Sequence, residues 1–279
     1  MATNSPAKNS SPAVVVGIDG SRWSVDAALW AAAEAACRDL PLRLLYVIEP
    51  RDDSELTEQH AQEDLACAHV SVRRTVSAVE AQGGPVKIEW EIVAGKPSRI
   101  LQDASRSAEL VCVGAMGIAH ATGQRLGSTS GALSTSAHCP LAIIRGDQQP
   151  SGKPGSVVVE IDERPDNARI FDIAIGEARL RGVPLTVLVT TSTGRLQARA
   201  QLDRRIAEYR SRYPDVEFDI VVVRGSTMNH LDHHADSIQT LVVGQHRAAA
   251  LGELLGRAPG QAQHRGDYTV LIGEHRGRH

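Results

Sequence analysis

Three glycines and two hydroxyl residues stand in a pattern that could hold a phosphate group. The segment Gly114-Ala-Met-Gly117 is followed by nine residues and then by Gly127, Ser128 and Thr129. Glycine lets a backbone come close to a phosphate and direct its N–H groups toward it. A helix beginning near Gly127 would add the positive end of its dipole. The spacing therefore predicts a phosphate-binding loop, although a plain surface loop would also account for three glycines.

The same segment lacks the motifs of several enzyme classes. It is neither a P-loop, which needs G-x-x-x-x-G-K-[ST], nor a dinucleotide fingerprint, which needs G-x-G-x-x-G after the first strand. Ser128 and Ser130 are poor hydrolytic nucleophiles, because no G-x-S-x-G elbow occurs and no His is placed to activate them. No S-G-G-x-D-S or H-x-G-H motif occurs, and no general base stands beside the loop. A binding protein is therefore expected rather than an enzyme.

Short apolar runs alternate with helical stretches and must position this loop. Strands are expected at 13–18, 42–48, 86–93, 110–113 and 141–144, with helices between them, one of them from Ser98 to about Ala108. Such alternation implies parallel strands, right-handed crossovers and a doubly wound five-stranded sheet. The loop directly follows the fourth strand. It should therefore lie at the carboxyl edge of the sheet, where ligands bind in folds of this class.

The second half of the chain repeats the first. Val157-Val-Val-Glu-Ile-Asp162 matches Val14-Val-Val-Gly-Ile-Asp19 at an offset of 143 residues. The same offset carries Glu34 onto Glu177 and Arg38 onto Arg181. The sequence therefore predicts two tandem α/β domains of one fold. We expect a disordered tail at 1–12, a first domain at 13–146, a linker rich in Pro, Gly and Ser at 147–155, and a second domain at 156–279.

Several motifs in fixed order resemble the universal stress protein family, whose fold is shared with adenine nucleotide alpha hydrolases. They are Val16-Gly-Ile-Asp-Gly-Ser21, Leu45-Tyr-Val47, Leu126-Gly-Ser-Thr-Ser130 and His138-Cys-Pro-Leu141. Members of this family that bind ATP carry G-x2-G-x9-G-[ST] at the position of the glycine loop. The resemblance covers nearly the whole chain and implies a tandem-domain member that binds ATP in its first domain.

The resemblance also assigns roles to residues. Asp19 and Val47 would border the adenosine, and Gly17 would allow close approach from the first strand. Val113, Gly114 and Gly117 would line the ribose and α-phosphate. Gly127, Ser128 and Thr129 would hold the outer phosphates. The full set implied to bind ATP is Gly17, Asp19, Val47, Val113, Gly114, Ala115, Met116, Gly117, Gly127, Ser128 and Thr129. A divalent cation, Mg²⁺ or Mn²⁺, would accompany the phosphates, with no separate protein metal site.

The second half departs from this pattern. Glu160 replaces Gly17, and Arg247 replaces Gly117. Gly256 lies one residue short of the required spacing from Gly244. A carboxylate would repel a triphosphate at short range, and an arginine side chain should fill the space that phosphates need. We therefore expect the second domain to have lost ATP binding. The alternative is a different anion bound by Arg247, Arg257 and His246.

Composition limits the remaining functions. A net charge of −3 gives no overall attraction for nucleic acid or an anionic membrane, and no apolar run is long enough to cross a bilayer. Four cysteines without a C-x-x-C pair fit a reduced, cytoplasmic setting. His230, His233 and His234 could in principle bind a transition metal, but a polar helix face is favoured, because the segment lacks H-E-x-x-H.

The resemblance implies an ATP-binding regulator of stress adaptation or growth. Homologous domains commonly pair through their last strands, here 141–144 and 270–272, so an intramolecular pseudo-dimer is expected and a further homodimer is plausible. Two other classes stay open. One is a slow ATPase or another nucleotide-dependent enzyme of the same fold. The other is an interaction module that binds no nucleotide.

Overall fold

The computed structural model describes residues 12–50, 58–117, 126–145, 155–161, 167–190, 196–223, 227–251 and 268–273, with the backbone alone at 196–202. The chain divides into two compact units, Met1–Gln148 and Gln149–His279, called unit 1 and unit 2 below. Nearly all of the expected tail and linker lie outside the described residues.

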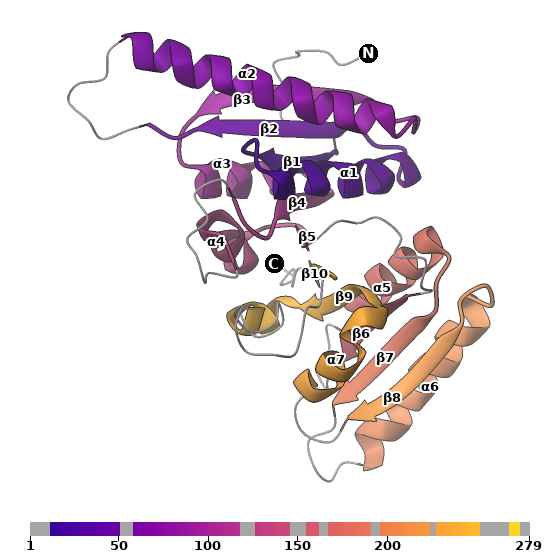
Figure 1. Cartoon of the computed structure of the whole chain (residues 1–279). Coiled ribbons are helices and arrows are strands. Elements are labelled where there is room, and N and C mark those ends of the chain that lie inside the picture. Colours follow the sequence, from indigo (N-terminus) through magenta and orange to yellow (C-terminus); the bar gives the residue numbers. More distant parts are fainter. Residues whose placement is uncertain are drawn as a thin grey trace. The chain divides into compact units, whose positions relative to one another are not determined.

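Unit 1 is an alternating α/β unit around one parallel sheet (Figure 1). Its elements are β1 (Val14–Ile18), α1 (Arg22–Cys37), β2 (Leu42–Ile48), α2 (Glu58–Ala81), β3 (Ile88–Ala94), α3 (Pro97–Ala104), β4 (Leu110–Gly114), α4 (Ser128–Ser136) and β5 (Leu141–Ile144). The strand order is β3-β2-β1-β4-β5, and each strand is parallel to its neighbour. The expected fold class is confirmed.

Local chemistry accounts for these elements. β1 is almost entirely buried, as expected for a β-branched strand in the middle of a parallel sheet. α1 begins after Ser21, whose side chain accepts a hydrogen bond of 3.1 Å from the Ser24 N–H and so caps the helix. α3 ends at Ala104, earlier than expected. The Ser105 hydroxyl there donates to the Gln102 carbonyl and accepts from the His138 N–H at 2.9 Å, which ties the end of α3 to the chain before β5.

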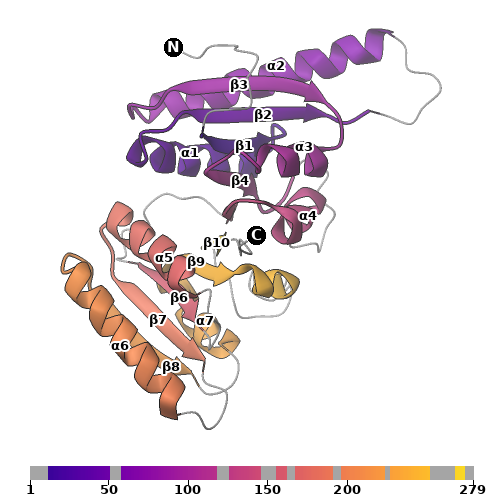
Figure 2. The ribbon, with the colours of Figure 1, turned by 180° about the vertical axis from the view of Figure 1, so that it is seen from behind.

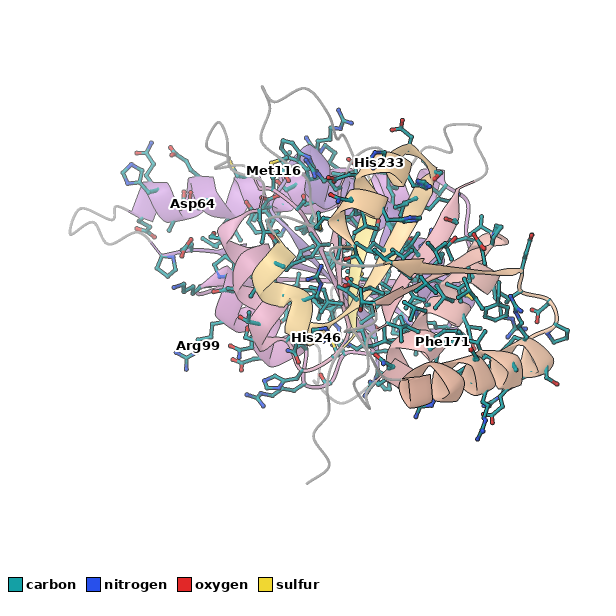
Figure 3. The ribbon with its side chains drawn as sticks, turned by 90° about the horizontal axis from the view of Figure 1, so that it is seen from below. Asp64, Arg99, Met116, Phe171, His233 and His246 are labelled. Carbon is teal, nitrogen blue, oxygen red and sulfur yellow. The ribbon has the colours of Figure 1, made fainter. Side chains whose placement is uncertain are left out.

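Unit 2 repeats this order. Its elements are β6 (Ser156–Ile161), α5 (Asn167–Arg181), β7 (Leu185–Thr190), α6 (Leu196–Arg212), β8 (Phe218–Val223), α7 (Met228–His234), the 3-10 helix η1 (Ala235–Ser237), β9 (Ile238–Gly244), the 3-10 helix η2 (Gln245–Ala250) and β10 (Thr269–Gly273). The strands follow the order β8-β7-β6-β9-β10 and are parallel. Figure 2 shows α6 lying along β7 and β8, and Phe171 of α5, labelled in Figure 3, stacks on Tyr209 of α6 with 4.4 Å between ring centroids.

A buried ion pair marks the duplication. Glu34 and Arg38 lie 2.8 Å apart near the end of α1, and the Glu34 side chain is fully buried. Glu177 and Arg181 form the same contact at 3.0 Å near the end of α5, with Glu177 again buried. These residues are the ones that the 143-residue offset aligns. The units therefore share a specific interaction as well as a strand order.

Candidate functional site

Unit 1 contains a cavity of about 380 Å³ at the carboxyl edge of its sheet. The strand order changes direction here, because β1 pairs with β2 on one side and with β4 on the other. Such a switch point leaves a crevice between the loops that follow the two central strands. The lining residues come from β1, α1, β2, α3, β4 and α4 and from the loops after β1, β2 and β4: Gly17, Ile18, Asp19, Ser24, Leu45, Tyr46, Val47, Glu49, Pro97, Leu101, Val113, Gly114, Met116, Gly117, Gly127, Ser128, Thr129 and Ser130.

The fold brings together the residues that the sequence singled out. All of the predicted ATP-binding residues line this cavity except Ala115, whose side chain is fully buried. Met116, labelled in Figure 3, belongs to the loop that follows β4. Residues 118–125 of the expected glycine loop lie outside the described residues.

Sequence reasoning missed the contribution of α3. Pro97 and Leu101 line the cavity, and Leu101 is only 2% exposed. The fold class could have indicated this contribution of α3, because the crossover from β3 to β4 must pass over β2 and β1. The helix on that crossover therefore lies above the switch point. Leu101 also closes the space over Gly17, where an added Cβ would lie 2.7 Å from the Leu101 Cδ1 atom.

The Ala115 backbone holds the two ends of the glycine loop together. Its N–H donates to the Ile144 carbonyl at 2.8 Å. Its carbonyl accepts from the Gly127 N–H at 2.7 Å and from the Ser130 hydroxyl at 3.1 Å. The Gly127 N–H is therefore engaged within the protein, so Gly127 closes the loop instead of directing that N–H into the cavity. The next two residues, Ser128 and Thr129, line the cavity.

The start of α4 suits an anion. Gly127 occupies its N-cap position without a side-chain cap, and the first turn contains no acidic residue. The first N–H groups of a helix have no carbonyl partner within the helix and carry the positive end of its dipole. Ser128 and Thr129 add two hydroxyl groups at the same place. The cavity therefore has a neutral, donor-rich end.

Two of the cavity glycines are required by contacts within the protein. A Cβ on Gly114 would lie 2.8 Å from the Trp23 carbonyl carbon, so the strand end packs directly against the first turn of α1. A Cβ on Gly117 would lie 2.6 Å from Asp19 Oδ2. The sequence expectation explained these glycines by the approach of a phosphate. The structure adds close packing against the protein at both positions.

Asp19 joins the end of β1 to the start of α1. Its Oδ1 atom accepts a 2.9 Å hydrogen bond from the Ser21 N–H, and Gly20 between them has φ 83, a value that favours glycine. Arg74 of α2 donates to the Gly20 carbonyl and fixes this turn. Burial raises the pKa of the neighbouring Tyr46, and the negative charge of Asp19 raises it further. Tyr46 therefore lines the cavity with its phenol in the neutral form.

The described residues contain no group of three or more His, Cys, Asp or Glu that could hold a metal ion. The His230 and His234 rings lie 4.3 Å apart on α7. Burial lowers the pKa of His230, and the neighbouring His234 lowers that pKa further. His233 contacts the Asn229 carbonyl of its own helix. These histidines therefore form no three-ligand metal site.

Within the described part of the chain, no helix combines the length and apolar character needed to span a bilayer.

Larger side chains stand at two of the corresponding positions in unit 2. Glu160 and Arg247, the counterparts of Gly17 and Gly117, form an ion pair of 3.0 Å. The Thr227 hydroxyl donates to the second Glu160 oxygen at 3.1 Å. Arg247 therefore contacts Glu160 at this place in unit 2. The loss of ATP binding in unit 2 stays a prediction. Arg257 and Gly256 lie outside the described residues.

Both units have a parallel, doubly wound α/β fold, and unit 1 has a ligand-sized crevice at its switch point. The chain is therefore a tandem protein of the doubly wound class. Comparison with known proteins gives the family. The universal stress protein family matches residues 12–145. Universal stress protein Rv2028c of Mycobacterium tuberculosis is 41% identical over 270 residues, covering 94% of this chain and 96% of its own. The chain belongs to the universal stress protein family.

Two further proteins show how far the likeness extends. Universal stress protein Rv3134c of Mycobacterium tuberculosis is 40% identical and covers 86% of this chain and 90% of its own. The crystal structure of a universal stress protein from Archaeoglobus fulgidus superimposes with a TM-score of 0.72, covering 95% of this chain and 97% of that one at 16% identity. The tandem length and the fold are therefore shared with other members.

Proposed function

We propose that unit 1 binds ATP in the switch-point cavity and that the protein acts as a nucleotide-responsive regulator of stress adaptation or growth in the cytoplasm. The observation that carries this proposal is the pairing of an apolar wall with an uncapped helix N-terminus in one cavity. Its volume of about 380 Å³ falls in the ordinary range for small-molecule sites.

The two ends of the cavity suit the two ends of a nucleotide. Leu45, Val47, Leu101 and Val113 supply an apolar surface for a planar base, and Asp19 supplies an acceptor for an amino or hydroxyl group. The start of α4 supplies N–H and hydroxyl donors for phosphate oxygens. We infer that adenosine lies along β1, β2 and α3, with the phosphates toward α4.

A divalent cation fits the same arrangement. Neither Lys nor Arg is among the described residues that line the cavity. Mg²⁺ or Mn²⁺ would therefore neutralise the triphosphate, coordinated by phosphate oxygens and water with hydroxyl support from Ser128 or Thr129. Mg²⁺ commonly binds in this way at nucleotide sites, with few protein ligands.

One ATP per chain is the expected stoichiometry, and it provides the test of the proposed function. We expect Asp19→Asn to weaken ATP binding by about tenfold or more, because a hydrogen bond to a charged group contributes about 1.5–3 kcal/mol. The matched Asp162→Asn variant, at the sequence counterpart in unit 2, should bind one ATP with wild-type affinity. Titration calorimetry of the full chain with Mg²⁺ measures both. Two ATP molecules per chain, or none, would overturn the proposal.

Hydrolysis of bound ATP is expected to be very slow. Efficient phosphoryl transfer needs a group that positions or deprotonates the nucleophile beside the terminal phosphate. The residues at the start of α4 offer N–H and hydroxyl groups, whereas the carboxylates that line the cavity, Asp19 and Glu49, follow β1 and β2. Phosphate release from the purified protein should stay close to background. Turnover of roughly 1–100 per second, the kinase range, would instead establish an enzyme.

A further inference from the structure

The cleft position of unit 2 contains three polar side chains that contact one another. Glu160 lies on β6, Thr227 precedes α7, and Arg247 lies on η2. Their counterparts in unit 1, at offsets of 143 and 130 residues, are Gly17, Pro97 and Gly117. All three counterparts line the cavity of unit 1. At these three wall positions, unit 2 therefore has side chains that contact one another.

The contacts form a closed set. Arg247 Nε donates to Glu160 Oε2 at 3.0 Å, and the Thr227 hydroxyl donates to Glu160 Oε1 at 3.1 Å. Arg247 Nη2 lies 3.5 Å from the Thr227 hydroxyl oxygen. Both carboxylate oxygens of Glu160 thus have a donor. The set joins the carboxyl ends of β6 and β9 to the N-terminus of α7. The counterparts of these elements in unit 1, β1, β4 and α3, contribute residues to the cavity.

Because Glu160 is buried, it depends on Arg247 for a counter-charge. The Glu160 side chain is 9% exposed, the Arg247 side chain is 25% exposed, and Thr227 is 2% exposed. A carboxylate removed from water is costly unless it is paired and hydrogen-bonded. The better exposed guanidinium can recover hydration from solvent. Loss of Arg247 should therefore destabilise unit 2 much more than loss of the negative charge on Glu160.

We propose that the set formed by Glu160, Thr227 and Arg247 is an internal substitute for a ligand. It fills the cleft position of unit 2 and holds the surrounding elements together without nucleotide. Arg247 supplies the charge that satisfies the buried carboxylate, and the two side chains occupy positions that are glycines in the cavity wall of unit 1. The substitution of cavity walls by this set determines that a tandem chain with two copies of one fold has its ligand site in unit 1.

A double-variant cycle in the full chain tests this inference by hydrogen exchange and thermal unfolding. We expect Arg247→Met to speed exchange in peptides from β6, β9 and α7 by about tenfold or more, because it leaves Glu160 buried without a counter-charge. Glu160→Gln should have a smaller effect, since the amide still accepts from Thr227. Combining the two should restore slow exchange, because the buried charge is gone. Peptides from unit 1 should not change in any variant.

The control is an ion pair on the surface of the same unit. Arg179 and Asp215 lie 2.7 Å apart with side chains 53% and 52% exposed. Asp215→Asn should leave exchange within about twofold of wild type, as expected for exposed pairs. The inference would be wrong if hydrogen exchange in Arg247→Met were as slow as in this control. It would also be wrong if adding Glu160→Gln to Arg247→Met sped exchange further instead of slowing it. Both readouts are independent of ATP binding, so the outcome is separable from that of the proposed function.

Discussion

Replacing Gly117 with alanine is expected to weaken ATP binding by roughly 10- to 100-fold, which corresponds to about 1.4–2.8 kcal/mol. The added Cβ would lie 2.6 Å from Asp19 Oδ2, so the carboxylate and the loop must move apart. Both groups line the proposed nucleotide site. The contact is with the end of a side chain, so unit 1 should stay folded while the cavity changes shape. Titration calorimetry and a melting curve of the same sample measure both effects.

Gly131→Ala is the matched control for this variant. It makes the same chemical change inside α4, at a residue outside the cavity lining, where the new Cβ would make an ordinary 3.4 Å contact with Leu126. Its affinity for ATP should equal that of the wild type, and its stability should be equal or higher, because alanine favours a helix. Wild-type affinity in a folded Gly117→Ala protein would show that the loop does not hold the nucleotide.

Gly114→Ala is expected to destabilise unit 1, with a melting temperature lower by on the order of 5–10 °C. Here the new Cβ would lie 2.8 Å from the Trp23 carbonyl carbon and 2.9 Å from its oxygen, so the backbone of α1 itself must shift. Packing an extra group against a fixed backbone typically costs about 1–3 kcal/mol, occasionally more. Differential scanning calorimetry, with hydrogen exchange to assign the transition to unit 1, provides the measurement.

Gly127→Ala separates this packing effect from the general effect of adding a methyl group at the site. Its Cβ would lie 3.4 Å from the Ser130 hydroxyl oxygen, an ordinary contact, and Gly127 has φ −67. Its stability should therefore change little. A melting temperature of Gly114→Ala within about 2 °C of that of Gly127→Ala would contradict the contact with α1 as the reason for glycine at 114.

Most of the fold could be predicted from local patterns. The runs at 42–48 and 141–144 have the bounds of β2 and β5, because buried parallel strands are largely apolar segments. The alternation of strands and helices, together with the preference for right-handed crossovers, leaves few possible topologies. α3 was predicted too long. The C-cap residue of the helix is Ser105, whose hydroxyl accepts a hydrogen bond from the His138 N–H. Local patterns could not predict this contact, because the two residues are far apart in the chain.

By itself, the sequence determined the duplication, the fold class and the place of the glycine loop, since each follows from periodicity or spacing along the chain. Tertiary structure alone decided which contacts give those residues their roles. Gly114 meets Trp23 only because α1 packs over the end of β4, and Leu101 reaches the cavity only because α3 crosses β1. Glu160 and Arg247 are 87 residues apart, and parallel strand pairing brings them together. Their ion pair became visible only in three dimensions, because local patterns carry no information about which distant side chains share one buried space.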